Sequence, residues 1–146
     1  MSLPANCDFT PSMYRRLLRS LKEAGYTFQT FEEYLLSPGK KIVILRHDVD
    51  RRPQNAWRFA EIESEMRIRG SYHFRSVGSS NEPKIIRRIA DSGHEIAYHY
   101  EDMTLAPKMT GKAISSSVEK LASIAFESFR SHLAYFRKYY PVRVIS

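Results

Sequence analysis

Two aspartates that follow an aliphatic run are the clearest candidates for chemistry in this chain. Residues 40–50 read Lys-Lys-Ile-Val-Ile-Leu-Arg-His-Asp-Val-Asp. Because side chains alternate along a strand, Asp48 and Asp50 lie on one side of it, together with Arg46. Two carboxylates on one wall either share a proton or hold a cation. The alternative is an acidic cap followed by a solvated turn before a helix that Pro53 opens, since Asp-x-Asp is a short motif.

A second polar cluster follows a later strand-like segment. Residues 93–102 read Gly-His-Glu-Ile-Ala-Tyr-His-Tyr-Glu-Asp and end in side chains that can bind metals or move protons. Ligands of α/β proteins gather at the carboxyl ends of strands, so we expect both clusters at one edge of a sheet. His94 and His99 have opposite parity on a regular strand. We therefore expect His94 to be a hydrogen-bonded structural histidine, because buried polar groups are normally satisfied.

Taken together, the sequences HDVD (47–50) and GHEIAYHYED (93–102) resemble the motifs of the polysaccharide deacetylase family, which includes chitin and peptidoglycan deacetylases. The flanking segments LKEAGYTFQTFEEYL and IIRRIADSGHEI are similar as well, so the resemblance covers the chain from about residue 11 onward. It implies an α/β barrel of parallel strands with a divalent metal, usually zinc, at their carboxyl ends. It also implies an N-acetylated carbohydrate substrate, whose acetyl group is removed by hydrolysis of a non-peptide C–N bond.

The resemblance assigns a role to each matching residue. Asp48 would be the general base, and Asp50 and His99 would be metal ligands. A second histidine of the family would fall at Met103, but a thioether suits soft ions and not zinc in a hydrolase. The metal would acidify a bound water and polarise the substrate carbonyl, and the base would take the proton of that water.

Four other side chains could complete such a site. Glu101 and Asp102 offer carboxylate oxygens that zinc and harder cations accept, or else they begin a solvated loop. Arg46 is a possible substrate contact. Arg75 shares a strand face with His73, and either side chain could line a substrate cleft. An arginine within a sheet more often pairs with a carboxylate, and we expect one of the two aspartates of the first motif to serve.

Two further functions stay open on the sequence. A catalytically silent glycan-binding or interaction module would account for Met103, and for a chain that ends at Ser146 before the family motifs that supply the catalytic acid. A phosphatase of the haloacid dehalogenase type also places Asp-x-Asp after a buried strand. There a threonine or valine is expected two residues after the second aspartate, where this chain has Arg52.

Composition limits the partners and the compartment. The 146 residues carry a net charge of +7, but no nucleic-acid motif accompanies the spread of basic residues, so no nucleic-acid partner is expected. The sequence has no run of 18 apolar residues, and therefore no membrane span is predicted. The N-terminus lacks a signal pattern and Cys7 is the single cysteine, which together favour a reducing cytoplasm.

The elements that must position these residues alternate between strands and helices. Helices are predicted at 12–24, 53–69, 82–92 and 112–139, a short helix or turn at 27–36, and strands at 42–45, 71–77, 94–100 and 142–145. The first strand is predicted to be buried on both faces, because it consists of four aliphatic residues. This order demands parallel pairing with right-handed crossovers. We predict a single α/β domain over residues 1–146 that resembles the first half of a deacetylase barrel.

A half-barrel has consequences for assembly. Its outer strands would leave unpaired backbone groups, and its inner wall around Ile42 and Ile44 would lack a facing layer. We therefore expect self-association, most simply as a two-fold dimer, or a long last helix that folds over the gap. Whether the chain is a shortened natural product or part of a longer protein stays open.

Overall fold

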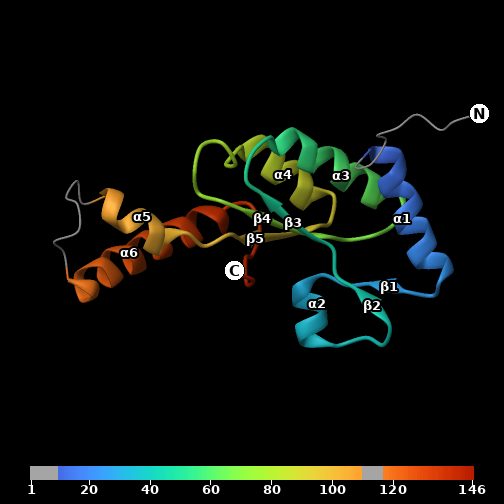
Figure 1. Ribbon diagram of the computed structural model, residues 1–146, viewed down its shortest axis with the longest axis horizontal. Coiled ribbons are helices and arrows are strands. Elements are labelled where there is room, and N and C mark those ends of the chain that lie inside the picture. The colour runs from blue at the N-terminus through green and yellow to red at the C-terminus, as the bar shows by residue number, and fades with distance from the viewer. Residues whose placement is uncertain (1–9, 110–116) are drawn as a thin grey trace, which may run out of the picture.

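The computed structural model describes residues 10–109 and 117–146, which form an α/β arrangement (Figure 1). The helices are α1 Pro11–Glu23, α2 Phe31–Leu36, α3 Pro53–Glu65, α4 Pro83–Asp91, α5 Asp102–Met109 and α6 Val118–Phe136, and the strands are β1 Thr27–Phe28, β2 Ile42–Val43, β3 Arg46–Val49, β4 Ser71–Phe74 and β5 Glu95–Tyr98. All strand pairs within the described ranges are parallel, as predicted. None of these helices is both long enough and apolar enough to cross a membrane.

The main sheet has the strand order β3-β4-β5. Its register places Asp48 opposite His73, and His73 opposite Ala97. An isolated parallel bridge between Tyr98 and Ile145 extends the sheet beyond β5, where a full strand at 142–145 was predicted. Strands β1 and β2 form a separate two-stranded sheet. The strands of the described residues close no barrel, so the half-barrel stays a prediction.

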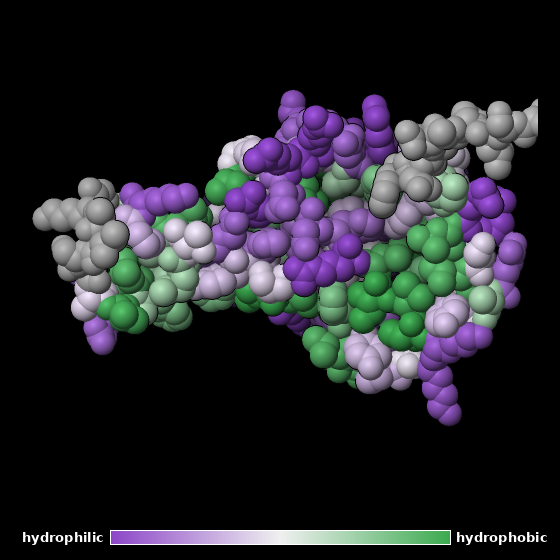
Figure 2. Space-filling model, in the orientation of Figure 1, coloured by the Kyte–Doolittle hydropathy of each residue, from purple (hydrophilic) through white to green (hydrophobic). Residues whose placement is uncertain are grey.

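The aliphatic run 42–45 differs from its prediction as one strand buried on both faces. Ile42 and Val43 form β2 and pair with β1, whereas β3 begins only at Arg46. All four aliphatic residues are half-buried, because the chain leaves one sheet and enters the other within this run. Figure 2 shows apolar residues gathered on the surface between α1 and the β1–β2 sheet. The prediction failed because the partner strand β1 was expected to belong to a helix or turn.

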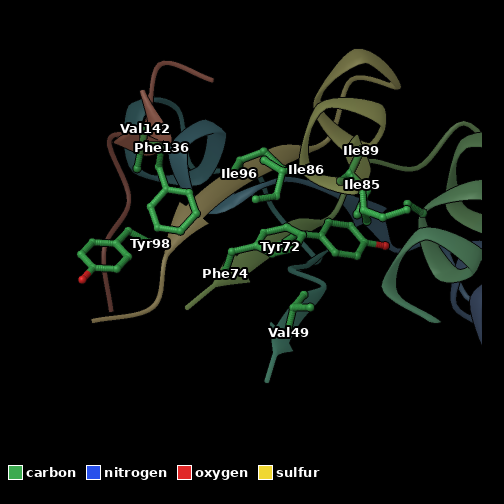
Figure 3. Packing of buried hydrophobic residues seen from close by; sticks show 11 residues of the cluster. Val49, Tyr72, Phe74, Ile85, Ile86, Ile89, Ile96, Tyr98, Phe136 and Val142 are labelled. Carbon is green, nitrogen blue, oxygen red and sulfur yellow. The ribbon is translucent and has the colours of Figure 1, made fainter. Parts of the chain in front are cut away.

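The core lies between the main sheet and its helices (Figure 3). Every residue of β4 and β5 is buried, as expected for strands that are covered on both faces. Helix α4 contributes Ile85, Ile86 and Ile89, which share one helix face and pack with the sheet residues Tyr72 and Ile96. This packing fixes β4 and β5, and with them the polar side chains that follow each strand.

The chain between β5 and residue 136 also differs from its prediction. The helix expected at 112–139 is found as α6 from Val118 to Phe136, and its predicted start falls outside the described residues. Helix α5 replaces the loop that was expected after β5. In Figure 1 the α5–α6 pair extends sideways beyond the end of the main sheet. Asp102 is the first residue of α5 and is fully buried, so it does not begin a solvated loop.

Candidate functional site

The two sequence motifs meet at the carboxyl edge of the main sheet. Asp48 belongs to β3, and His99 follows β5 directly. An oxygen of the Asp48 carboxylate lies 3.5 Å from Nδ1 of His99. The backbone N–H of His99 donates to the carbonyl of Phe74 at 2.9 Å, which holds the residue beside β4. The parallel register therefore brings together two residues that lie far apart in the sequence.

Arg46 stabilises the ionised form of Asp48. Its Nε donates to Asp48 Oδ1 at 2.8 Å, and its Nη2 donates to the hydroxyl of Ser146 at 3.0 Å. Burial of the Asp48 carboxyl opposes ionisation, but the hydrogen bond and the positive charge of Arg46 outweigh it. The pKa of Asp48 is therefore lowered, and the side chain is a carboxylate at neutral pH.

His73 is a fully buried histidine beside this carboxylate. Its Nδ1 lies 2.9 Å from the hydroxyl oxygen of Ser146, whereas its Nε2 has no hydrogen-bond partner. Burial lowers the pKa of His73 to about 4, so the imidazole is neutral at pH 7. Nδ1 of His99 is likewise buried without a hydrogen bond.

In the described part of the chain these are the only two buried side-chain nitrogen or oxygen atoms that lack a partner. A buried polar group left unpaired costs about 1–3 kcal/mol. Both atoms belong to neighbours of Asp48, because His73 lies opposite it on β4 and Nδ1 of His99 is 3.5 Å from its carboxylate. Unpaired groups concentrated at one carboxylate indicate a place where a ligand or substrate completes the hydrogen bonding. The sequence singled out His99 here, but gave His73 only the general role of lining a cleft.

Asp50 follows β3 and lies near Arg75. The guanidinium of Arg75 binds the Glu101 carboxylate through Nε and Nη2, both at 2.8 Å. The nearest oxygen of Asp50 is 3.8 Å from Arg75 Nε. Arg75 was expected to pair with an aspartate of the first motif, but its main partner is Glu101. Glu101 is therefore engaged in an ion pair and is not a free metal ligand.

The donor set that the resemblance implies for zinc does not fit as it is arranged. Asp50 has a side chain that is 59% exposed and lies next to a guanidinium, and Met103 is exposed on α5. Within residues 10–109 and 117–146, no group of three or more histidine, cysteine, aspartate or glutamate side chains could hold a metal ion. We therefore assign no step of a reaction to a metal.

Asp102 is held inside a polar network between α5 and α6. Its carboxylate accepts hydrogen bonds from the hydroxyls of Tyr98 and Ser128, the latter at 2.5 Å, and lies 2.7 Å from Nδ1 of His132. It is consequently saturated and is not available as a ligand. His132 of α6 is thus an ion-pair partner of Asp102. No local pattern could have revealed this pairing, because the residues belong to different helices.

His94 has the structural role that its strand parity predicted. It is fully buried, its Nδ1 accepts from the backbone N–H of Gly70 at 3.0 Å, and its Nε2 lies 3.1 Å from the carbonyl of Ala60. Burial is the main reason that its pKa is lowered. A neutral imidazole that bridges two backbone groups has no free position for a ligand.

His47 of the first motif also has a structural role. Its Nε2 lies 2.6 Å from an oxygen of Glu63, which is fully buried in α3. Glu63 accepts further hydrogen bonds from the hydroxyls of Tyr14 at 2.5 Å and Tyr72 at 2.9 Å. The motif thus divides between the two faces of β3, with His47 on the structural side and Asp48 at the candidate site.

A cavity of about 300 Å³ opens beside Asp48. Its polar lining comes from the end of β3 and the start of α3, and consists of Arg46, His47, Asp48, Arg51, Arg52 and Asn55. A volume of this size is at the lower end of the range for small-molecule sites. The cavity shares Asp48 with the candidate site, but its lining lies between β3 and α3 and includes neither His73 nor His99.

Searches of protein-family models, curated proteins and solved structures found no match to this chain. The deacetylase family therefore stays a resemblance carried by the two motifs. The chemistry of Asp48, His73 and His99 is the remaining basis for a function.

Proposed function

We propose that this chain is a hydrolase-family domain of the deacetylase type, which removes acetyl groups from N-acetylated sugars by cleaving a non-peptide C–N bond. The observation that carries the proposal is the meeting of Asp48 and His99 at 3.5 Å, where both unpaired buried imidazole nitrogens are also found. Hydrolysis of an amide needs groups that accept and donate protons next to the scissile bond. Asp48, His73 and His99 offer such groups at the carboxyl edge of a parallel sheet, where α/β enzymes place them.

Asp48 is the base in this proposal. Because its pKa is lowered, it is ionised at neutral pH and can accept a proton from a water molecule that attacks the acetamide carbonyl. The new C–O bond gives a tetrahedral intermediate, and cleavage of the C–N bond releases acetate and an amine. The amine must gain a proton as it leaves. Asp48 can pass the proton it took from the water to His99, whose Nδ1 lies 3.5 Å away, and His99 then donates a proton to the leaving nitrogen.

In this proposal, His73 stabilises the oxyanion of the tetrahedral intermediate. Arg46 donates to the Ser146 hydroxyl, which leaves the hydrogen of that hydroxyl free for Nδ1 of His73. A neutral imidazole that accepts at Nδ1 carries its hydrogen on Nε2. The unpaired Nε2 is then a buried donor, and a donor held in a dry site stabilises a developing negative charge strongly.

A glycan-binding module without turnover is the second candidate. It is favoured by the ion pairs of the first motif, because Arg46 holds Asp48 at 2.8 Å and Arg75 lies 3.8 Å from Asp50. Carboxylates neutralised in this way can orient a bound sugar without acting as bases. Such a module would bind N-acetylated sugars and release no acetate.

Acetate release separates the two functions. We expect the purified chain to release acetate from N-acetylated chito-oligosaccharides, with and without added zinc. Asp48→Asn is expected to lower kcat/KM by a factor of about 10²–10⁴, the usual contribution of a general base. Asp91→Asn is the matched control, because Asp91 is an exposed aspartate at the end of α4. Sugar binding by calorimetry without any acetate release would refute the hydrolase and support the binding module.

A further inference from the structure

Side chains that follow three neighbouring strands of the main sheet meet at the guanidinium of Arg75. Asp50 follows β3, Arg75 follows β4, and Glu101 comes after β5, immediately before α5. Nε and Nη2 of Arg75 each lie 2.8 Å from an oxygen of the Glu101 carboxylate, and Nε lies 3.8 Å from an oxygen of Asp50. One positive group therefore faces two carboxylates, one from each of the two sequence motifs.

The hydroxyl groups of two serines hold Arg75 beside Asp50. The Ser80 hydroxyl is fully buried; its oxygen accepts from the backbone N–H of Arg75 at 3.1 Å, and it donates to the carbonyl of Val49. The hydroxyl of Ser79 donates to the carbonyl of Asp50 at 3.2 Å. The segment that carries Arg75 is thus attached to the end of β3 by bonds that are independent of the ion pairs.

The pairing of Arg75 with Glu101 competes with metal binding. Arginine binds both oxygens of a carboxylate through two parallel N–H groups, and these charge-assisted hydrogen bonds are strong. A divalent cation would need the same oxygens at about 2.0–2.6 Å, so it would have to displace the guanidinium. The side chains of Arg75 and Glu101 are only 24% and 22% exposed, so water and salt screen this pair less than a pair on the open surface.

We propose that the guanidinium of Arg75 takes the position of a divalent cation at this edge of the sheet and closes Asp50 and Glu101 to metals. Arg75 is a positioning residue, which holds the two carboxylates and supplies a positive charge that arginine keeps at all physiological pH values. This assignment departs from the metal-binding role that the resemblance implies for Asp50. It rests on the proposed function in one respect, because it states that acetate release by this chain needs no added metal.

Manganese titrations test the inference without relying on turnover. The purified chain is treated with EDTA, dialysed, and titrated with MnCl₂ by calorimetry, because Mn²⁺ prefers carboxylate oxygens to imidazole nitrogens. We expect Arg75→Met to bind Mn²⁺ about tenfold or more tightly than the wild type, since loss of the guanidinium frees both carboxylates. Arg75→Lys keeps a positive charge beside them and should gain about threefold or less.

Further variants locate the gained site. Arg75→Met combined with Asp50→Asn and Glu101→Gln should return the Mn²⁺ affinity to that of the wild type. Arg15→Met is the control, because it removes an arginine whose ion pair with Glu65 lies on other helices, and it should leave the affinity unchanged. Arg75→Gln repeats the test if Arg75→Met does not fold, because an amide can still donate to Glu101. Circular dichroism shows which variants are folded.

The outcomes separate this inference from the proposed function. Equal Mn²⁺ affinities of the wild type and the folded Arg75→Met or Arg75→Gln variant would overturn the inference. Acetate release that requires added zinc and is lost in Asp50→Asn would also overturn it, while supporting the hydrolase. Mn²⁺ binding that is gained only without Arg75, in a chain that releases no acetate with or without zinc, would support the inference while refuting the hydrolase.

Discussion

Three polar residues in or directly after neighbouring strands determine what the candidate site can do. Asp48 is anionic because Arg46 outweighs the effect of burial on its pKa, and His73 is neutral because it is fully buried. His99 lies between the carboxylate and the backbone of Phe74. A charged acceptor next to a neutral imidazole is suited to proton transfer, since the two groups occupy different protonation states at one pH.

Loss of Arg46 should shift the pH dependence of the reaction. Without the guanidinium, burial alone acts against ionisation of Asp48, so its pKa rises. The base is active only when it is ionised. We therefore expect the acidic limb of the kcat/KM profile of Arg46→Met to move to higher pH. Arg15→Met is the control, because it removes an arginine whose ion pair with Glu65, at 2.5 Å, lies on other helices. An unmoved acidic limb would show that Asp48 is not the titrating base.

His73 should make the protein less stable in acid. Its pKa is about 4 in the folded state, against 6.5 for a histidine exposed to water, so the unfolded chain binds more protons between these two pH values. The free energy of unfolding therefore rises with pH from about 4 to 6.5, by on the order of 3 kcal/mol from this residue. The contribution is fully present above pH 6.5 and is lost as pH falls toward 4.

A His73→Phe variant isolates that contribution. Phenylalanine has a similar shape and cannot titrate, and it removes the unpaired Nε2. We expect a smaller slope of stability against pH in urea denaturation between pH 4 and 6.5, together with lost turnover. Equal slopes for the wild type and the variant would rule out a buried neutral His73.

At the scale of elements, α4 is the support on which the site depends. Ile86 and Ile89 are fully buried and pack with the residues of β4 and β5, which end at the candidate site. Because this face of α4 is apolar, it packs against β4 and β5 and holds the ends of these strands in place. The α5–α6 pair is joined differently, through the buried Asp102 and its hydrogen bonds to residues of α6.

Truncation of the α4 face should destabilise the whole fold. Ile86→Ala removes a fully buried side chain from the core, and we expect it to lower the free energy of unfolding by about 2–5 kcal/mol. Leu36→Ala is the control, because Leu36 is 71% exposed at the end of α2 and its truncation should change stability by less than about 0.5 kcal/mol. Chemical denaturation measures both. Similar losses for the two variants would mean that α4 does not form part of the core.

At the scale of the molecule, the face drawn in Figure 2 carries an apolar patch. The run 42–45 is only half-buried, and Figure 2 shows apolar residues gathered between α1 and the small sheet. Exposed apolar patches commonly mark association surfaces. We therefore expect the self-association that was predicted from the sequence to use this apolar patch.

Light scattering at micromolar concentration tests self-association. We expect a dimer, which Ile44→Lys should shift toward the monomer by placing a charge within the half-buried run. Val118→Lys is the control, because Val118 is 72% exposed at the start of α6, in the helix pair that extends beyond the sheet. A stable wild-type monomer with cooperative unfolding would show that the described elements suffice alone.

Local patterns in the sequence were sufficient for several elements. The helices predicted at 12–24 and 82–92 correspond to α1 and α4 within one residue at each end, because apolar periodicity and the glycines Gly25 and Gly93 mark them. Both glycines have positive φ, which explains why the helices stop there. The alternation of strands and helices likewise implied parallel pairing. The place of Asp48 and His99 at one sheet edge followed from that order.

The sequence by itself thus determined the α/β class, the main helices, and which two motifs would meet. Only the tertiary structure decided the partners of the polar side chains: Arg75 with Glu101, Asp102 with α6, and an unpaired Nε2 on His73. It also placed only Ile42 and Val43 of the run 42–45 in a strand, in the small sheet with β1. The physical reason is that the spacing of apolar residues reports only on the local structure of one helix or strand. Ion pairs and burial depend on which distant elements come into contact when the chain folds.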